Sequence, residues 1–212
     1  MEKFISVTSK ACPLALANVD TDQILPARYL KVKRAAGFGP YLFHDLRRKD
    51  GELDPNFPLN QPQWRDVKLI VAGRNFGGGS SREAAVYALQ DGGIRCVIAP
   101  SFGDIFSQNA TKNGLLTAVV SEGDGEAIAV ACANGLGVTV NLETCRISCG
   151  NQEWPFTIDP TRRERLLNGW DDIALTQNFS GEIAAFRSRD RAQRPWKYPS
   201  SPTLPNEPRH SE

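Results

Sequence analysis

The chain has 212 residues, of which 41% are hydrophobic, and its formal net charge at pH 7 is +1. This length and apolar content are sufficient for a globular domain with a substantial buried core. Because 24 acidic residues balance 25 basic ones, the composition gives no electrostatic signal for binding to nucleic acid or to an anionic membrane. No apolar run approaches the roughly 18 residues of a membrane span, and the first residues lack the features of a signal peptide. We expect a cytoplasmic protein that binds neither nucleic acid nor membrane.

Two segments of mixed composition come before the regular part of the chain. The segment NVDTDQILPARYL, residues 18–30, mixes turn-forming residues with an apolar stripe. Asp20, Thr21 and Asp22 in this segment fit a turn and a helix cap. Residues 33–65 are rich in glycine, proline, asparagine and charge, and we interpret them as a loop excursion.

Regular alternation begins at Val67. Strands are predicted at 67–72, 95–99 and 115–120, with helices at about 81–90 and 102–114 between them. The order strand, helix, strand predicts an α/β fold with a parallel βαβ core.

The last third is predicted to contain smaller elements. They are short strands and turns over 137–158, a helix over 159–170 that Gly169 closes, and short helices over 171–176 and 180–189. We therefore expect one domain over residues 1–187, and a disordered tail over the proline- and charge-rich residues 188–212.

The stretch GRNFGGGSSREAA, Gly73 to Ala85, follows the first of these strands and opens a helix. Glycines in this position leave backbone N–H groups free at the positive end of the helix dipole, which favours an anion. The nucleotide-binding glycine motifs do not fit, and GxSxG fails because Arg82 occupies its last position. We expect a site for carboxylate binding or proton transfer.

A structural interpretation of the same stretch stays open. Ser80 and Glu83 have the spacing of a capping box, in which the serine hydroxyl and the glutamate close free N–H groups of the first helical turn. A cap needs only one serine, whereas this segment also offers Asn75, Ser81 and Arg82.

The five cysteines are scattered and form no CxxC pair: Cys12, Cys96, Cys132, Cys145 and Cys149. This set is typical neither of a disulfide framework nor of a zinc site, and the thiols lack the close spacing of iron–sulfur ligands. We expect buried free thiols and no metal or other cofactor held by this chain.

Several motifs together resemble the small subunits of 3-isopropylmalate dehydratase, in the aconitase superfamily. They are NVDTDQILPARYL, GFGPYLFHD, NFGGGSSRE, VIAPSFGDIF, NGLL and FTIDPTRRERLLNGWDDIALT. The resemblance implies a swivelling β/β/α domain and a large partner subunit that carries a four-iron four-sulfur cluster. It also implies removal and re-addition of water on a small dicarboxylic 2-hydroxy acid, as in the isomerisation of 2- and 3-isopropylmalate in leucine biosynthesis.

The resemblance also assigns roles to residues. Ser80 would be the base, as its alkoxide, and Asp22 would lie close by in an orienting role. Arg82 and backbone N–H groups of the loop would stabilise the alkoxide and hold the substrate carboxylate; these loop residues are Gly77, Gly78, Gly79 and Ser81. Ser81 is either a cap or a substrate ligand, and either Arg28 or Arg34 would grip the distal carboxylate.

The chain departs from the family pattern NFGCGSSREH at two positions. Gly78 replaces the cysteine and Ala84 replaces the histidine, and Tyr87 stands where tryptophan is common. Two alternatives therefore stay open: a paralogous subunit for citraconate, methylmalate or dimethylmaleate, or a catalytically silent binding module.

Overall fold

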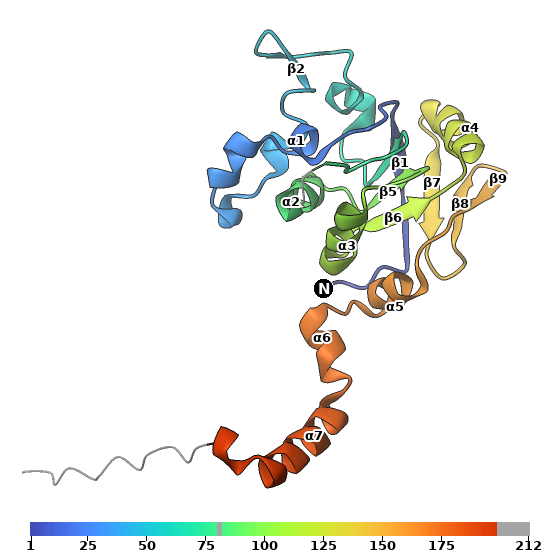
Figure 1. Cartoon of the computed structure of the whole chain (residues 1–212). Coiled ribbons are helices and arrows are strands. Elements are labelled where there is room, and N and C mark those ends of the chain that lie inside the picture. Colours follow the sequence, from blue (N-terminus) through green and yellow to red (C-terminus); the bar gives the residue numbers. More distant parts are fainter. Residues whose placement is uncertain (80–81, 199–212) are drawn as a thin grey trace, which may run out of the picture. The chain divides into compact units, whose positions relative to one another are not determined.

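The computed structural model of the protein describes residues 1–79 and 82–198 (Figure 1). The chain divides into two compact units, Met1–Asp172 and Ile173–Glu212. The first unit contains every strand of the described chain. None of the described helices is long and apolar enough to cross a membrane.

A seven-stranded sheet forms the centre of the first unit, in the order β6-β5-β4-β1-β7-β8-β9. The strands are β1 (Ser6–Leu14), β4 (Leu69–Ala72), β5 (Cys96–Ala99), β6 (Leu116–Val119), β7 (Gly137–Asn141), β8 (Arg146–Cys149) and β9 (Gln152–Pro155). The predicted parallel core is confirmed, because β1, β4, β5 and β6 all pair in parallel.

Strand β1 joins the two halves of this sheet. Its first part, residues 6–10, pairs antiparallel with β7, and its second part, residues 11–14, pairs in parallel with β4. The antiparallel half continues through β8 and β9 and corresponds to the short strands predicted over 137–158.

Helices cover both faces of the parallel strands, as Figure 1 shows: α2 (Glu83–Asp91), α3 (Asp104–Asn113), α4 (Glu122–Ala133) and α5 (Pro160–Asn168). Successive residues of a strand point to opposite faces, so Ile70 packs with α2 and α3, whereas Leu69 packs with α4 and α5. Strands β4 and β5 are buried at every position, which explains their continuous apolar runs. Gly169 ends α5 in a left-handed conformation, as predicted.

The excursion over residues 33–65 is irregular but firmly packed. It contains the hairpin β2 (Arg48–Lys49) and β3 (Glu52–Leu53) and several short 3₁₀ turns. Phe38, Phe43 and Trp64 from this segment are buried in the core that α2 shares. Buried aromatic side chains therefore hold a segment whose backbone has no regular period. Before it lie the short helix α1 (Thr21–Ile24) and the 3₁₀ turn Ala27–Lys31.

The second unit contains α7 (Ser180–Gln193) and all of α6 (Asp172–Gln177) except its first residue. Helix α7 runs through residues 188–193, where disorder was expected, because alanine, arginine and glutamine favour a helix until Pro195 ends it. Asp190 forms an ion pair with Arg194 and accepts a hydrogen bond of 2.9 Å from the Tyr198 hydroxyl. The two units are divided after Asp172, and residues 199–212 lie outside the described part.

Candidate functional site

The glycine-rich loop after β4 pairs with the loop between β5 and α3. The amide of Phe76 donates to the Ser101 carbonyl at 3.0 Å, and the amide of Gly103 donates to the Phe76 carbonyl at 2.9 Å. The Ser101 hydroxyl accepts a further hydrogen bond of 2.8 Å from the backbone amide of Asn75. These contacts fix the first part of the loop, at Asn75 and Phe76, against the loop that precedes α3. The glycine-rich motif by itself does not indicate that Ser101 contacts this loop.

Two glycines are required by the packing of this loop. Gly77 has φ +73°, and a Cβ atom there would lie 2.2 Å from Cγ of Phe106. A Cβ atom at Gly103 would lie 2.5 Å from the Gly77 carbonyl oxygen. Any side chain at these positions would therefore collide with a ring or with backbone.

The NVDTD segment packs directly against the glycine loop. The Gly77 amide donates to the Val19 carbonyl at 2.7 Å, and the Thr21 amide donates to the Gly78 carbonyl at 3.2 Å. The amide of Gly77 is thus already used within the fold. An anion held by loop amides would have to use those that follow Gly77.

Asp20 is the cap of α1. Its carboxylate accepts from the Gln23 amide at 2.7 Å, and the Gln23 side chain accepts from the Asp20 amide at 2.9 Å. This reciprocal pair is a capping box, so the helix-cap interpretation of this segment is confirmed for Asp20.

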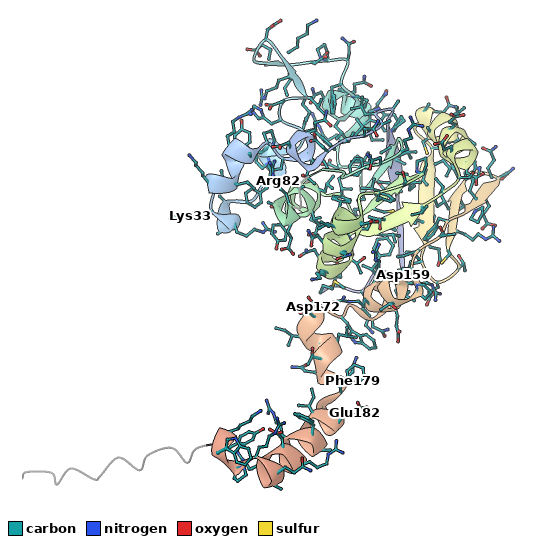
Figure 2. The ribbon with its side chains drawn as sticks, viewed as in Figure 1. Lys33, Arg82, Asp159, Asp172, Phe179 and Glu182 are labelled. Atoms are coloured by element: carbon teal, nitrogen blue, oxygen red, sulfur yellow. The ribbon has the colours of Figure 1, made fainter. Side chains whose placement is uncertain are left out.

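Asp22 instead forms an ion pair with Arg82, the residue that directly precedes α2. Figure 2 shows Arg82 at the amino end of that helix. The Asp22 carboxylate also accepts from the Ala27 amide at 3.1 Å. The hydrogen bond with Arg82 lowers the pKa of the Asp22 carboxyl and raises the pKa of the Arg82 guanidinium. Only 19% of the Arg82 side chain is exposed, so its charge is held in a defined place.

The capping box predicted for Ser80 and Glu83 does not have the register it needs. Helix α2 begins at Glu83, with Arg82 in the cap position, whereas the box needs Glu83 as the third helical residue. The Glu83 carboxylate accepts from the Asn113 side chain at 2.8 Å. Ser80 and Ser81 themselves lie outside the described residues.

Arg28, one of the two arginines considered for the distal carboxylate, lies near Asp22. Both residues line a shallow depression of about 350 Å³. The guanidinium of Arg28 donates to Asp45 through both terminal nitrogens, at 2.9 Å for one of them. Arg28 holds the pKa of the Asp45 carboxyl down to about 2, with a smaller contribution from His44.

Arg34, the other candidate, lies at the far end of α2. It donates twice to Asp91, the last residue of that helix, at 2.8 and 3.1 Å. Its guanidinium lies over the ring of Tyr87, 4.5 Å from the centroid. Arg82 stands at the opposite end of the same helix. In this structure Arg28, and not Arg34, shares a depression with Asp22.

Gly78 lies close to the side chain of Asn75. A Cβ atom at Gly78 would lie 3.1 Å from Oδ1 of Asn75, which is tight but not forbidden. The Asn75 side chain donates to Asn18 at 3.1 Å. The side-chain amide of Asn75 therefore lies beside Gly78.

The cysteine side chains are buried or partly buried. Cys12, Cys96, Cys132 and Cys149 are buried and Cys145 is partly buried, all as free thiols. Burial raises the pKa of Cys12 to about 12, and burial is also the main cause that raises the pKa of Cys132 to about 12. Within the described residues no group of three or more His, Cys, Asp or Glu side chains could hold a metal ion. The described residues therefore do not fit an iron–sulfur cluster.

Comparison with known proteins identifies the class of this domain. Residues 1–123 match the aconitase C-terminal domain family. The crystal structure of 3-isopropylmalate dehydratase from Methanocaldococcus jannaschii is similar, with a TM-score of 0.62 and 26% sequence identity. The match covers 88% of this chain and 99% of that one. The fold and the glycine-rich loop thus define a domain of the aconitase C-terminal class.

Curated relatives show which family within this class the chain belongs to. The protein of Rhodospirillum centenum is 50% identical over 92% of this chain and 98% of its own length. The protein of Allorhizobium ampelinum is 46% identical, and that of Paracoccus denitrificans 44%, each over 92% of this chain and 100% of its own length. All three are named 3-isopropylmalate dehydratase small subunit. The chain belongs to this family of small subunits.

Proposed function

We propose that the chain is the small subunit of a hydro-lyase that interconverts 2- and 3-isopropylmalate, a step of leucine biosynthesis. The shared name of relatives that match almost end to end supports this reaction. The observation that carries the role of this chain is the Asp22–Arg82 ion pair beside the glycine-rich loop.

The reaction requires a proton to leave a carbon atom next to a carboxylate. Negative charge then grows on that carboxylate, so a fixed cation beside it lowers the barrier. A guanidinium has five N–H donors, more than the single carboxylate of Asp22 can use, which leaves donors for the substrate. Asp22 orients Arg82, and Arg82 binds the carboxylate.

The proposal assigns proton removal to Ser80. A serine hydroxyl is a weak base unless its alkoxide is stabilised. Arg82 supplies positive charge within two positions of Ser80, and the start of α2 adds the positive end of its dipole. Ser81 and the amides of Gly78 and Gly79 are the remaining candidates for contacts with the substrate.

We also propose that a large subunit supplies the four-iron four-sulfur cluster and that the complex is a cytoplasmic heterodimer. The membership in a small-subunit family supports the existence of a larger partner. Four of the five cysteines of this chain are buried and Cys145 is partly buried, which supports a cluster bound by the partner. The names of the relatives do not favour a subunit for citraconate, methylmalate or dimethylmaleate, or a silent module.

The test is to co-purify the chain with its large subunit without oxygen and to follow the ultraviolet absorbance of the alkene. This absorbance rises when 2-isopropylmalate or methylmalate loses water and falls when citraconate or dimethylmaleate gains it. We expect 2-isopropylmalate to react well, while citraconate, methylmalate and dimethylmaleate serve as competing substrates. The chain alone and a complex with Arg82→Ala are the controls. Faster turnover of one of the competing acids would replace the proposed substrate, and no turnover of any acid by the intact complex would favour a silent module.

A further inference from the structure

A second pocket lies between the excursion and the carboxyl end of α2, with a volume of about 340 Å³. Two glycines permit the close approach that forms it. A Cβ atom at Gly39 would lie 2.6 Å from the Asp91 carbonyl oxygen, and one at Gly92 would lie 2.7 Å from the Leu42 side chain. The volume falls within the range of small-molecule sites.

One wall of this pocket is apolar. Leu42, Trp64 and Ile94 line it, and these residues are 3%, 4% and 1% exposed, respectively. Leu59, from the 3₁₀ turn that precedes Trp64, lies in the same lining. This wall offers an aliphatic group a place away from water.

The lining of this pocket also carries positive charge. Arg47 and Arg65 both line the pocket. Arg47 is partly buried, and its guanidinium donates to the Asn60 side chain at 2.8 Å and to the Leu59 carbonyl at 3.4 Å. These acceptors are neutral. Burial, with a smaller effect of Arg48, lowers the pKa of Arg47.

Neither Arg47 nor Arg65 forms an ion pair with a carboxylate of the described chain, within a nitrogen-to-oxygen distance of 4.0 Å. Asp66 also lines the pocket but is paired with neither arginine. A partly buried cation without a charged partner is costly, and an anion in the pocket would compensate it.

We propose that this pocket binds a small carboxylate with a short aliphatic tail, with the carboxylate at Arg47 and Arg65 and the tail against Leu42, Trp64 and Ile94. The nine residues of α2 separate the pocket from Arg82, which corresponds to about 13 Å along the helix. The site is independent of the proposed reaction, because its ligand makes no contact with Arg82. Inorganic phosphate would satisfy the arginines but leave the apolar wall unused.

The test uses the full chain and three probes: 3-methylbutanoate, acetate and inorganic phosphate. Binding is measured by calorimetry and by the indole N–H signal of Trp64 in a ¹H–¹⁵N spectrum, assigned with Trp64→Phe. We expect 3-methylbutanoate to shift the Trp64 signal in a saturable way and to bind about tenfold more tightly than acetate, because of the buried tail. The signal of Trp154, in β9, should not move.

Two variants and a control decide the role of the arginines. Arg65→Gln changes an exposed side chain and should weaken binding of 3-methylbutanoate about tenfold. Arg47→Lys should weaken it as well, and Arg65→Gln remains decisive if the Arg47 variant is unstable. Arg48→Gln, an exposed neighbour outside the pocket lining, should leave the affinity unchanged. The proposal is overturned if Trp64 does not respond, if phosphate binds as tightly, or if Arg48→Gln has the same effect as Arg65→Gln.

Discussion

The guanidinium of Arg82 and the carboxylate of Asp22 form an ion pair that joins the start of α2 to the helix α1. The pair connects the two sequence motifs that are closest to the proposed chemistry. Asp20, which lies in the same NVDTD segment as Asp22, instead caps α1. The two aspartates therefore have different roles although they are only two positions apart.

Replacing Arg82 with lysine should lower the turnover of the reconstituted complex by about a hundredfold, or roughly 3 kcal/mol in the barrier. A guanidinium can bind two carboxylates through donors fixed in one plane, whereas an ammonium is a point charge on a flexible stem. Arg74→Lys is the matched control, because Arg74 is in the same loop but 65% exposed. Near-normal turnover of Arg82→Lys, with the fold checked by circular dichroism, would remove Arg82 from the site.

Replacing Asp22 with asparagine should reduce turnover about tenfold, less than the change at Arg82, because the side chain loses its charge but keeps an acceptor. Asp20→Asn is the control, since asparagine caps a helix as well as aspartate does. Because Arg82 lowers the pKa of Asp22, the pair is complete above the ordinary carboxyl pKa of 3.8 and is lost as the pH falls through the lowered value. Asp22 should therefore not titrate between pH 6 and 8. In that range the turnover of the wild type and the turnover of Asp22→Asn should depend on pH in the same way.

Replacing Ser80 with alanine should nearly abolish turnover while substrate still binds, because the base is lost and the contacts of Arg82 remain. Ser121→Ala is the comparison, since the Ser121 hydroxyl accepts from the Asp124 amide at 3.0 Å and caps α4. That change should cost about 1 kcal/mol of stability without slowing the reaction. If Ser80→Ala behaves like Ser121→Ala, with lower stability and full turnover, Ser80 has a structural role and is not the base.

Replacing Gly77 with alanine should destabilise the fold by about 2–4 kcal/mol, since the new Cβ atom would collide with the Phe106 ring and the backbone has a positive φ. Gly78→Ala should cost much less, because only the Asn75 side chain needs to shift. Thermal and urea unfolding measure both. Equal losses at the two positions would contradict the packing described for this loop.

The Arg28–Asp45 pair should be visible in the titration of Asp45. The pKa of the Asp45 carboxyl is held at about 2, mainly by Arg28, so the pair is intact above about 3.8 and is lost as the pH falls toward 2. In Arg28→Gln the carboxyl should titrate close to 3.8, as followed by ¹³C NMR. His44→Asn should produce a smaller change in the same direction. An unchanged Asp45 titration in Arg28→Gln would show that the pair does not persist in solution.

The sequence by itself determined the elements whose signals are local. The apolar runs at β4, β5 and β6 predicted buried parallel strands, and Gly169 predicted the end of α5. These predictions are confirmed because each depends on only a few neighbouring residues. A strand that is buried on both faces requires a run of apolar residues, and a left-handed helix end favours glycine. The order of the motifs likewise identified the family before any geometry was known.

The tertiary structure decided which groups meet. The pattern at Ser80 and Glu83 suggested a capping box, but the start of α2 at Glu83 does not allow that register. The sequence offered Arg28 and Arg34 equally, and only the packing placed Arg28 near Asp22 and Arg34 against Asp91. The Asp22–Arg82 pair and the pocket beside Arg47 depend on contacts between distant segments, which no local pattern encodes, because such contacts are set by how the excursion and the two loops pack on the sheet.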